Sequence, residues 1–267
     1  MLDKKIILVG RNSFLSQNFS IFLRKKKIKF VKFGLNKFMK MRHSSLKNCE
    51  VVLNFSINKD FIQKKYSIKN DYDLMIAKKI KETNIRLIVF STSKVYKSAT
   101  NLKETSPKKP LANYGKNKLN SENNIMKILS NYVILRTGNV IGKKLKKNKR
   151  SVTNTFFDTV RSNLKKDKII VPEKNSFKDF IFIEDFCIIL HKIITKKIKG
   201  IYNLSSGRKT YLHSIAKMIS DNTKIPIIYD KKDDTDSFTL SNLKLLKALK
   251  INYNLRKINS KNLRKYL

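Results

Sequence analysis

Residues 5–16 read KIILVGRNSFLS, a short apolar run that ends at Gly10 and leads directly into a stretch with helical spacing. A short apolar run closed by glycine suits a parallel strand that is buried on both faces. The apolar face of the helix expected over residues 14–26 consists of Phe14, Leu15, Phe19, Phe22 and Leu23. A strand, a turn and a helix in this order predict the first unit of an α/β fold.

The same alternation continues along the chain. Further strands are expected at FVKF (30–33), VVLNFS (51–56), RLIVFS (86–91) and YVILRT (132–137). Helical spacing covers residues 72–83 and resumes near residue 115. Strands that alternate with helices imply right-handed crossovers and a parallel sheet covered on both faces. The sequence therefore predicts an α/β fold with a doubly wound, Rossmann-type parallel sheet, which binds ligands at the carboxyl ends of its strands.

The turn after the first strand is where such folds hold a pyrophosphate against helix amides. Gly10 stands in the first glycine position of that turn, and Ser13 and Ser16 stand in the other two. Serine is small and carries a hydroxyl, so a phosphate pocket can still form. An ordinary strand–turn–helix would show the same residues, and the turn alone leaves both interpretations open.

The second expected strand, in VKFGLNKF (31–38), ends without the acidic residue that would hold the ribose of NAD. Lys32 and Lys37 lie nearby and permit a 2′-phosphate. The cofactor expected from these residues is NADP or NAD, and the two lysines favour NADP. The preference is small, because lysine is abundant throughout the chain.

Composition limits the class of protein. The chain has 267 residues and is 41% hydrophobic, enough for one large domain or one domain with a small lobe. No apolar run approaches the roughly 20 residues of a membrane helix. The first residues, MLDKKIILVGRN, carry Asp3 and make a poor signal peptide. We therefore expect a cytoplasmic protein without membrane insertion.

Cysteine and histidine usage points away from disulfides and metals. The two cysteines, Cys49 and Cys187, do not form a disulfide framework and are expected to be reduced, buried thiols. The three histidines are far apart in sequence and lack the spacing of metal ligands. We expect no metal site.

The net charge of +41 arises from 60 Lys and Arg against 19 Asp and Glu. One interpretation is binding to nucleic acid or to an anionic membrane surface. The other is a compositional bias, since Gly (7), Pro (4) and Trp (0) are scarce and the lysines are spread along the whole chain. We favour the second, although a dispersed positive field would still attract a phosphorylated substrate.

A series of short segments follows in order along the chain. They are VVLNFS (51–56), KNDYDLMIAKKIKE (69–82), FSTSKVY (90–96), NYGKNKLNSE (113–122), LRTGNVIGK (135–143), KDFIFIEDF (178–186), GIYNLSSG (200–207) and SNLKLLKALKI (241–251). In order and spacing this series resembles the extended short-chain dehydrogenase/reductase family, the NAD-dependent epimerase/dehydratase group that acts on nucleotide sugars. The resemblance spans nearly the whole chain.

The resemblance implies how the chain divides. A dinucleotide-binding domain would cover residues 1–140, with a return segment at about 178–206. A small C-terminal substrate-binding lobe would consist of residues 141–177 and 207–267. In similar proteins the helices that begin near residues 72 and 115 pair across a dimer axis, so a homodimer is expected.

Tyr114 precedes Lys118 by four residues, the spacing that places two side chains on one face of a helix. This spacing arises by chance in a lysine-rich chain, and Tyr253 and Lys257 repeat it. Only Tyr114 follows a strand that ends in serine and threonine, so we interpret Tyr114 as functional and Tyr253 as structural. The resemblance assigns the first pair to catalysis.

The expected chemistry is hydride transfer assisted by a tyrosine. A phenol has a pKa of about 10, and a neighbouring ammonium lowers it toward the range in which it can accept a proton. The resemblance implies that Tyr114 exchanges a proton with a sugar hydroxyl and that Lys118 also holds the cofactor ribose. Thr92 would orient the substrate oxygen, with Ser93 as the neighbour that could substitute.

The resemblance also implies two sets of binding residues. The expected cofactor-binding residues are Gly10, Ser13, Phe14, Leu15, Asn54, Phe55, Ser56, Asn70 and Lys118. The expected substrate-binding residues are Asn139, Arg150 and Arg161. The basic residues among them would bind a nucleotide diphosphate, and a solvated basic loop is the alternative.

One departure from the family narrows the reaction. In the sugar dehydratases of this family an acid follows the catalytic hydroxyl pair, and here Lys94 stands at that position. A lysine cannot protonate a leaving hydroxyl as a carboxylic acid does. We therefore expect keto-sugar reduction, alcohol oxidation or epimerisation of a nucleotide-activated sugar, in polysaccharide biosynthesis.

A second hypothesis comes from a different class of protein. The charge of +41 and the glycine-poor turn would also suit a catalytically eroded family member that acts as a nucleic-acid-binding or regulatory protein. Binding driven by phosphates would depend steeply on salt. We favour the enzyme over this alternative.

Overall fold

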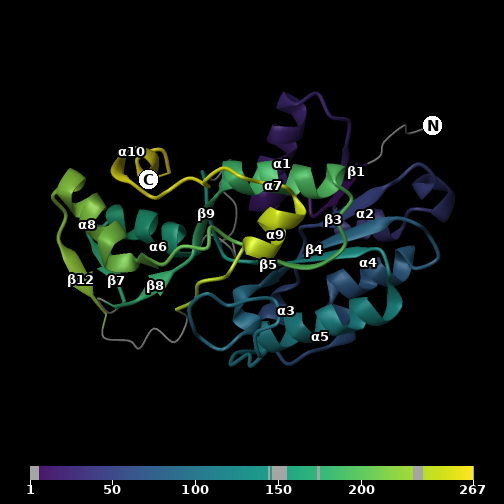
Figure 1. Ribbon diagram of the computed structural model, residues 1–267, viewed down its shortest axis with the longest axis horizontal. Coiled ribbons are helices and arrows are strands. Elements are labelled where there is room, and N and C mark those ends of the chain that lie inside the picture. Colours follow the sequence, from purple (N-terminus) through teal and green to yellow (C-terminus); the bar gives the residue numbers. More distant parts are fainter. Residues whose placement is uncertain (1–5, 144, 146–154, 173–174, 231–236, 267) are drawn as a thin grey trace. The chain divides into compact units, whose positions relative to one another are not determined.

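The computed structural model describes residues 6–143, 145, 155–172, 175–230 and 237–266 (Figure 1). The chain separates into two compact units. The first unit consists of Met1–Lys97, Pro107–Arg136 and Ile189–Tyr202, and the second of Ser98–Ser106, Thr137–Ile188 and Asn203–Leu267. The second unit thus contains residues 98–106, which lie inside the predicted dinucleotide-binding domain at 1–140. The limits of the two predicted domains stay a prediction.

The first unit is built on a six-stranded sheet in the order β10-β5-β4-β3-β1-β2. The strands are β1 (Ile6–Val9), β2 (Val31–Phe33), β3 (Val51–Asn54), β4 (Arg86–Thr92), β5 (Tyr132–Thr137) and β10 (Gly200–Leu204). β1 pairs in parallel with β2 on one side and with β3 on the other, and β3 pairs in parallel with β4. The predicted doubly wound sheet is confirmed.

Burial explains the composition of the central strands. Every residue of β1, β3 and β4 is buried, so no position alternates toward solvent. A parallel strand covered on both faces requires a nearly continuous apolar sequence. The runs IILV and VVLN satisfy this requirement, and their length of four residues matches the strands that the structure contains.

Helices cover both faces of this sheet (Figure 1). They are α1 (Phe14–Lys25), α2 (Leu35–Met39), α3 (Lys59–Gln63), α4 (Tyr72–Ile80), α5 (Asn113–Ile128) and the part of α7 (Ile183–Thr195) that begins at Ile189. Helices α4 and α5 pack on one face, where their apolar residues join one core with residues of β1, β3, β4 and β5. α1 lies on the other face, where the ring of Phe22 lies 5.8 Å from that of His191 in α7.

The order of strands reverses between β1 and β3. Ligands of doubly wound folds bind at this switch point, beyond the carboxyl ends of the strands. Gly10 follows β1 and has a φ of +91°, in the region that favours glycine. A Cβ at this position would lie 2.6 Å from the backbone nitrogen of Ser56, which follows β3. The turn therefore requires glycine for its conformation and for the close approach of the two strand ends.

A buried ion pair ties α5 to the sheet. Glu122 of α5 accepts hydrogen bonds from Ser91 Oγ of β4 at 2.5 Å and from Arg136 Nη2 of β5 at 2.7 Å. Arg136 also donates to the hydroxyl of Tyr96 at 2.8 Å. The side chains of Glu122 and Arg136 are each 2% exposed, so each charge depends on the other for compensation.

The second unit contains short strand pairs and helices. Its pairs are β6 (Asn139–Ile141) with β9 (Phe180–Phe182), β7 (Ile169–Val171) with β12 (Ile227–Tyr229), and β8 (Phe177–Lys178) with β11 (Thr210–Tyr211). Its helices include α6 (Thr155–Leu164), α8 (Leu212–Thr223), α9 (Leu243–Ala248) and α10 (Ser260–Leu263). Helix α9 lies within residues 241–251, the last segment of the series that carries the resemblance.

Two aspartates organise the second unit. Asp179 accepts hydrogen bonds from the backbone nitrogens of Ser206, Gly207 and Leu240, so one carboxylate joins segments more than 25 residues apart. Asp185 accepts a hydrogen bond from the backbone nitrogen of Arg256 at 2.7 Å and pairs with its guanidinium. Both carboxylates thus hold backbone segments in place.

Both cysteines are free thiols, and burial raises the pKa of Cys49 to about 12. The described residues hold no group of His, Cys, Asp and Glu side chains arranged around a metal position. Among the helices that the structure describes, none combines the length and the apolar character that a bilayer crossing requires.

Replacement of Gly10 tests the geometry of the switch point. We expect Gly10→Ala to lower the free energy of unfolding by about 1–3 kcal/mol, because alanine at positive φ is strained and its methyl group meets backbone atoms. Gly34→Ala is the matched control, since a Cβ there meets nothing within 4 Å, and should change stability by about 0.5 kcal/mol or less. Urea unfolding measures both. Equal losses in the two variants would contradict the described turn.

Candidate active site

Tyr114 lies in the first turn of α5, beside the carboxyl end of β4. Its phenol is hydrogen-bonded to the side chain of Thr92, the last residue of β4, and lies close enough to Lys118 to interact with its charge. Ser93 comes next and begins the short 3-10 helix Ser93–Val95. The structure thus brings Tyr114, Thr92 and Lys118 together, with Ser93 adjacent in sequence to Thr92.

Gly115 makes this arrangement possible. A Cβ at position 115 would lie 2.2 Å from the carbonyl oxygen of Lys94, well inside any permitted contact. The first turn of α5 therefore packs backbone against backbone on the turn after β4. This close packing brings the residue before Gly115 within reach of Thr92.

A chain of buried polar groups extends from Lys118. Its ammonium lies 2.7 Å from Asp73 Oδ2, and both side chains are 6% exposed. Asp73 Oδ1 in turn accepts a hydrogen bond of 2.6 Å from Asn54 Nδ2 at the end of β3. Asn54 Oδ1 accepts from the backbone nitrogen of Ser56 at 2.9 Å. These contacts connect α5 with the strand end at the switch point.

The charge of Lys118 is held firmly. Burial by itself lowers the pKa of Lys118, but the Asp73 carboxylate and the Tyr114 phenol oppose burial and raise the pKa above the usual value for lysine. Lys118 is therefore an ammonium throughout the neutral range. It can act as a fixed charge and as a hydrogen-bond donor.

The pKa of Tyr114 is raised above the ordinary value of a phenol. Burial is the main cause, and Asp73 adds to it, whereas Lys118 and the hydrogen bond with Thr92 lower the pKa. Within this set of groups the phenol keeps its proton at neutral pH. Phenolate formation requires a further positive charge beside the ring, since an opposite charge within a few ångströms favours the ionised form.

A second buried acid braces the same helix pair. Asp71 caps α4 by accepting from the backbone nitrogen of Leu74 at 3.0 Å, and it also accepts from Ser121 Oγ of α5 at 2.9 Å. Burial, followed by the neighbouring Asp73 carboxylate, raises the pKa of Asp71. Two carboxylates therefore join α4 to α5: Asp73 binds Lys118, and Asp71, the N-cap of α4, binds Ser121.

The turn that is expected to hold a phosphate leads into α1. Ser13 caps the helix by accepting from the backbone nitrogen of Ser16 at 3.2 Å. The amides of Phe14 and Leu15 occupy the first turn, where backbone donors have no acceptor within the helix. Ser16 is fully buried, and its hydroxyl has no hydrogen-bond partner among the residues that the structure describes. A serine therefore fits the third glycine position.

The other expected cofactor-binding residues divide into two groups. Phe55 is buried and stacks on Phe90 with ring centroids 4.8 Å apart, so its side chain has a packing role. Ser56 and Asn70 line the same shallow crevice as Asp73 and Lys118. The side chain of Asn70 accepts a hydrogen bond from Asn58 at 3.0 Å rather than from this polar chain.

The expected substrate-binding residues belong to the second unit. Asn139 donates from its side-chain and backbone nitrogens to the carbonyl oxygen of Asp179. Arg161 pairs with Asp158 at 2.9 Å and donates to the carbonyl oxygen of Tyr266. Arg150, like the neighbouring Lys147 and Lys149, lies outside the described residues.

Asp73 is the site residue that sequence reasoning missed. It lies four residues before Ala77 and seven before Ile80, on the stripe of α4 that faces the core. An acid on the apolar stripe of a helix, in a chain with only 19 Asp and Glu, was the signal that could have identified it.

Comparisons with known proteins identify a family and similar folds. The model of the family described as "RmlD substrate binding domain" matches residues 54–236. The fold is similar to that of a UDP-N-acetylglucosamine 4-epimerase from Methanobrevibacter ruminantium, solved with UDP-N-acetylmuramic acid, at 18% identity and a TM-score of 0.79, with 100% of this chain and 97% of that chain covered. No curated protein matches the chain in sequence.

Two further solved structures are similar in fold. One is the dTDP-glucose 4,6-dehydratase of Bacillus anthracis in complex with NAD, at 15% identity and a TM-score of 0.78, covering 98% of this chain and 95% of that one. The other is RMD from Pseudomonas aeruginosa complexed with NADPH, at 14% identity and a TM-score of 0.77, covering 98% and 97%.

Removal of the Asp73 charge tests the buried pair. We expect Asp73→Asn to lower the free energy of unfolding by about 3–5 kcal/mol, because it leaves the buried ammonium of Lys118 uncompensated. Asp60→Asn is the control, since Asp60 forms an exposed pair with Lys64 at 3.0 Å and should contribute no more than about 1 kcal/mol.

The same two variants report on the phenol. Because Asp73 raises the pKa of Tyr114, Asp73→Asn should lower that pKa. Asp60→Asn should not change the pKa of Tyr114. Carbon-13 NMR of the tyrosine Cζ resonances, followed against pH, measures both. A Tyr114 pKa that does not respond to Asp73→Asn would contradict the described coupling.

Proposed function

Because the chain belongs to the RmlD substrate binding domain family, within the extended short-chain dehydrogenases/reductases, we propose that it is an NAD(P)-dependent oxidoreductase or epimerase that acts on a nucleotide-activated sugar. The observation that carries the proposal is the convergence of Tyr114, Thr92 and Lys118 at the carboxyl end of β4. This end lies on the same edge of the sheet as the glycine turn after β1.

The residues fit a dinucleotide. The turn at Gly10 leaves no room for a Cβ, and the first-turn amides of α1 supply donors for a pyrophosphate. Lys118 is buried and charged, so it can hold a ribose hydroxyl next to Tyr114. When bound, the nicotinamide supplies the hydride acceptor or donor and, in its oxidised form, a positive charge.

Tyr114 is the proposed acid and base. In the oxidative direction its phenolate takes the proton of the sugar hydroxyl while the carbon of that alcohol loses a hydride, and a ketone remains. In the reductive direction the phenol returns the proton to the oxygen of the ketone. Thr92 orients that oxygen, and Lys118 with the oxidised ring lowers the pKa of Tyr114 to offset burial.

Lys94 supports reduction or epimerisation over dehydration. Its backbone nitrogen donates to Thr92 Oγ1 at 3.3 Å, and it follows Thr92 and Ser93 in the turn after β4. A cationic side chain there cannot serve as the carboxylic acid that protonates a leaving hydroxyl. An oxidation followed by re-reduction at one sugar carbon requires only the groups already named.

We place the enzyme in the cytoplasm, in the assembly of a polysaccharide from nucleotide sugars. The proposal includes a homodimer paired through α4 and α5. Exposed lysines stand on these two helices, at Lys78, Lys116 and Lys127, and at the C-cap of α4, Lys81. Like charges across such an interface would weaken the pairing.

Loss of the phenol hydroxyl tests the mechanism. We expect Tyr114→Phe to reduce kcat about 10²–10⁴-fold with UDP-linked or dTDP-linked sugars, since this is the usual contribution of a positioned general base. Tyr253→Phe is the matched control, because Tyr253 has a lysine at the same spacing but is 42% exposed, and it should retain full activity. Undiminished turnover in Tyr114→Phe would refute the proposed role of the phenol.

Cofactor preference can be tested at the end of β2. Arg11 donates its backbone N–H to the carbonyl oxygen of Phe33, and Lys37 lies over the ring of Phe33 at 5.8 Å, so both residues lie near the end of this strand. We expect NADPH to bind about tenfold or more tightly than NADH, because charge-assisted hydrogen bonds contribute about 1.5–3 kcal/mol.

The variant Arg11→Glu/Lys37→Glu should remove that preference and leave NADH binding within about twofold, as measured by fluorescence titration. A preference for NADPH that persists in this variant would assign the 2′-phosphate to other residues.

A further inference from the structure

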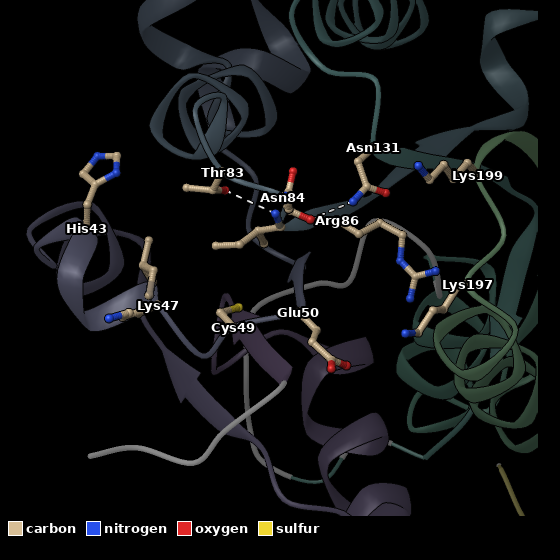
Figure 2. A pocket seen from close by; sticks show the side chains of 12 residues that line it. His43, Lys47, Cys49, Glu50, Thr83, Asn84, Arg86, Asn131, Lys197 and Lys199 are labelled. Carbon is tan, nitrogen blue, oxygen red and sulfur yellow. Dashed lines mark hydrogen bonds between the residues drawn. The ribbon is translucent and has the colours of Figure 1, made fainter.

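A cavity of about 460 Å³ lies in the first unit at the amino ends of the strands (Figure 2). Its lining residues precede β3, β4, β5 and β10 in the chain, except Arg86, which is the first residue of β4. They are His43, Leu46, Lys47, Cys49, Glu50, Thr83, Asn84, Ile85, Arg86, Asn131, Lys197 and Lys199. We name this cavity the amino-edge pocket. It occupies the edge of the sheet opposite to Gly10 and Thr92, where the proposed cofactor site lies.

The lining of the amino-edge pocket is strongly basic. Lys47, Arg86, Lys197 and Lys199 contribute positive charges, and Glu50 is the one acid among the lining residues. In Figure 2 Arg86 and Lys197 lie together on one side, and Lys47 lies on the other. A concave surface lined by charges of one sign concentrates counter-ions more than a convex surface with the same charges.

Arg86 is the fixed charge of the pocket wall. The residue is 6% exposed, and its guanidinium donates to the carbonyl oxygens of Ile194 at 2.7 Å and Ile198 at 3.4 Å. Carbonyl oxygens orient the guanidinium without neutralising it. Burial lowers the pKa of Arg86, an effect that the Glu50 carboxylate opposes. A negative charge in the pocket would therefore stabilise Arg86 further.

Two buried polar atoms of the wall lack hydrogen-bond partners within the described part of the chain. They are Arg86 Nε and Asn131 Oδ1. A buried donor without a partner costs about 1–3 kcal/mol. Asn131 is otherwise held by its Nδ2, which donates to the carbonyl oxygen of Asn84 at 2.8 Å. Both residues line the amino-edge pocket, so a polar ligand there would be a candidate partner for them.

We propose that the amino-edge pocket binds a small phosphorylated molecule, with its phosphate held by Arg86, Lys197 and Lys199. The volume lies within the range of about 300–1,000 Å³ that is typical of small-molecule sites. Guanidinium and ammonium groups are the usual protein ligands of phosphate. This site is separate from the proposed catalytic site, so it adds a second binding function to the unit.

Inorganic pyrophosphate is the probe for this site, titrated at constant ionic strength with chloride as the balancing anion. The readout is the Arg86 Nε–H resonance in proton–nitrogen NMR, which separates the pocket from any binding at the turn after β1. We expect a saturable shift of this resonance.

Charge reversal supplies the comparison. In Lys197→Glu/Lys199→Glu the dissociation constant should rise at least tenfold. In Lys59→Glu/Lys65→Glu, which makes the same change in net charge at exposed lysines outside the pocket, it should change by less than twofold. Both pairs are exposed, and matching backbone amide spectra will show that the variants are folded.

Three outcomes would overturn the proposal. The Arg86 resonance could remain unmoved by pyrophosphate, or the two double variants could lose affinity equally, which would assign the effect to the general positive field. A response to an RNA oligonucleotide but not to pyrophosphate would assign the basic wall to a different class of partner.

Discussion

The contact between Lys118 and Asp73 is the interaction on which the first unit's site depends. Two opposite charges removed from water must be placed accurately, because each would be costly alone. Their 2.7 Å contact joins α5 to α4, and the Asp73–Asn54 bond extends it to β3. Once this chain of contacts is formed, the orientation of α5 is determined and Tyr114 is held beside Thr92. The same carboxylate that positions the lysine also weakens its effect on the phenol, so the site is built to depend on an added positive charge.

The sheet could be predicted because burial on both faces leaves a strong signal. Runs such as IILV and VVLN have no alternative placement in a soluble α/β fold, and the glycine at position 10 marks the end of the first strand. Element limits were less accessible: α5 begins at Asn113 rather than near 115, since Gly115 packs on a backbone carbonyl and belongs inside the helix. The fold of the second unit, with its two- and three-residue strands, has too little periodicity to be predicted from the residues alone.

The catalytic candidates could be named from sequence because the strand-end hydroxyls and the tyrosine four residues before a lysine stand within a series of segments that resembles a known family. Asp73 has only an indirect local signal, an acid on the apolar stripe of α4, and Arg86 has none. Their roles depend on partners distant in the chain: Asp73 on Lys118, and Arg86 on the carbonyl oxygens of Ile194 and Ile198. In a chain with 60 lysines and arginines, no local pattern separates Arg86 from the exposed basic residues.

The backbone contact at Gly115 has a mechanical consequence. Since not even a methyl group fits between α5 and the carbonyl of Lys94, the helix cannot roll or slide along the turn without separating from it. Any collective motion of this part of the molecule must therefore move Tyr114 and Thr92 together. The hydroxyls of Tyr114 and Thr92 therefore stay together through such motions, as the proposed mechanism requires.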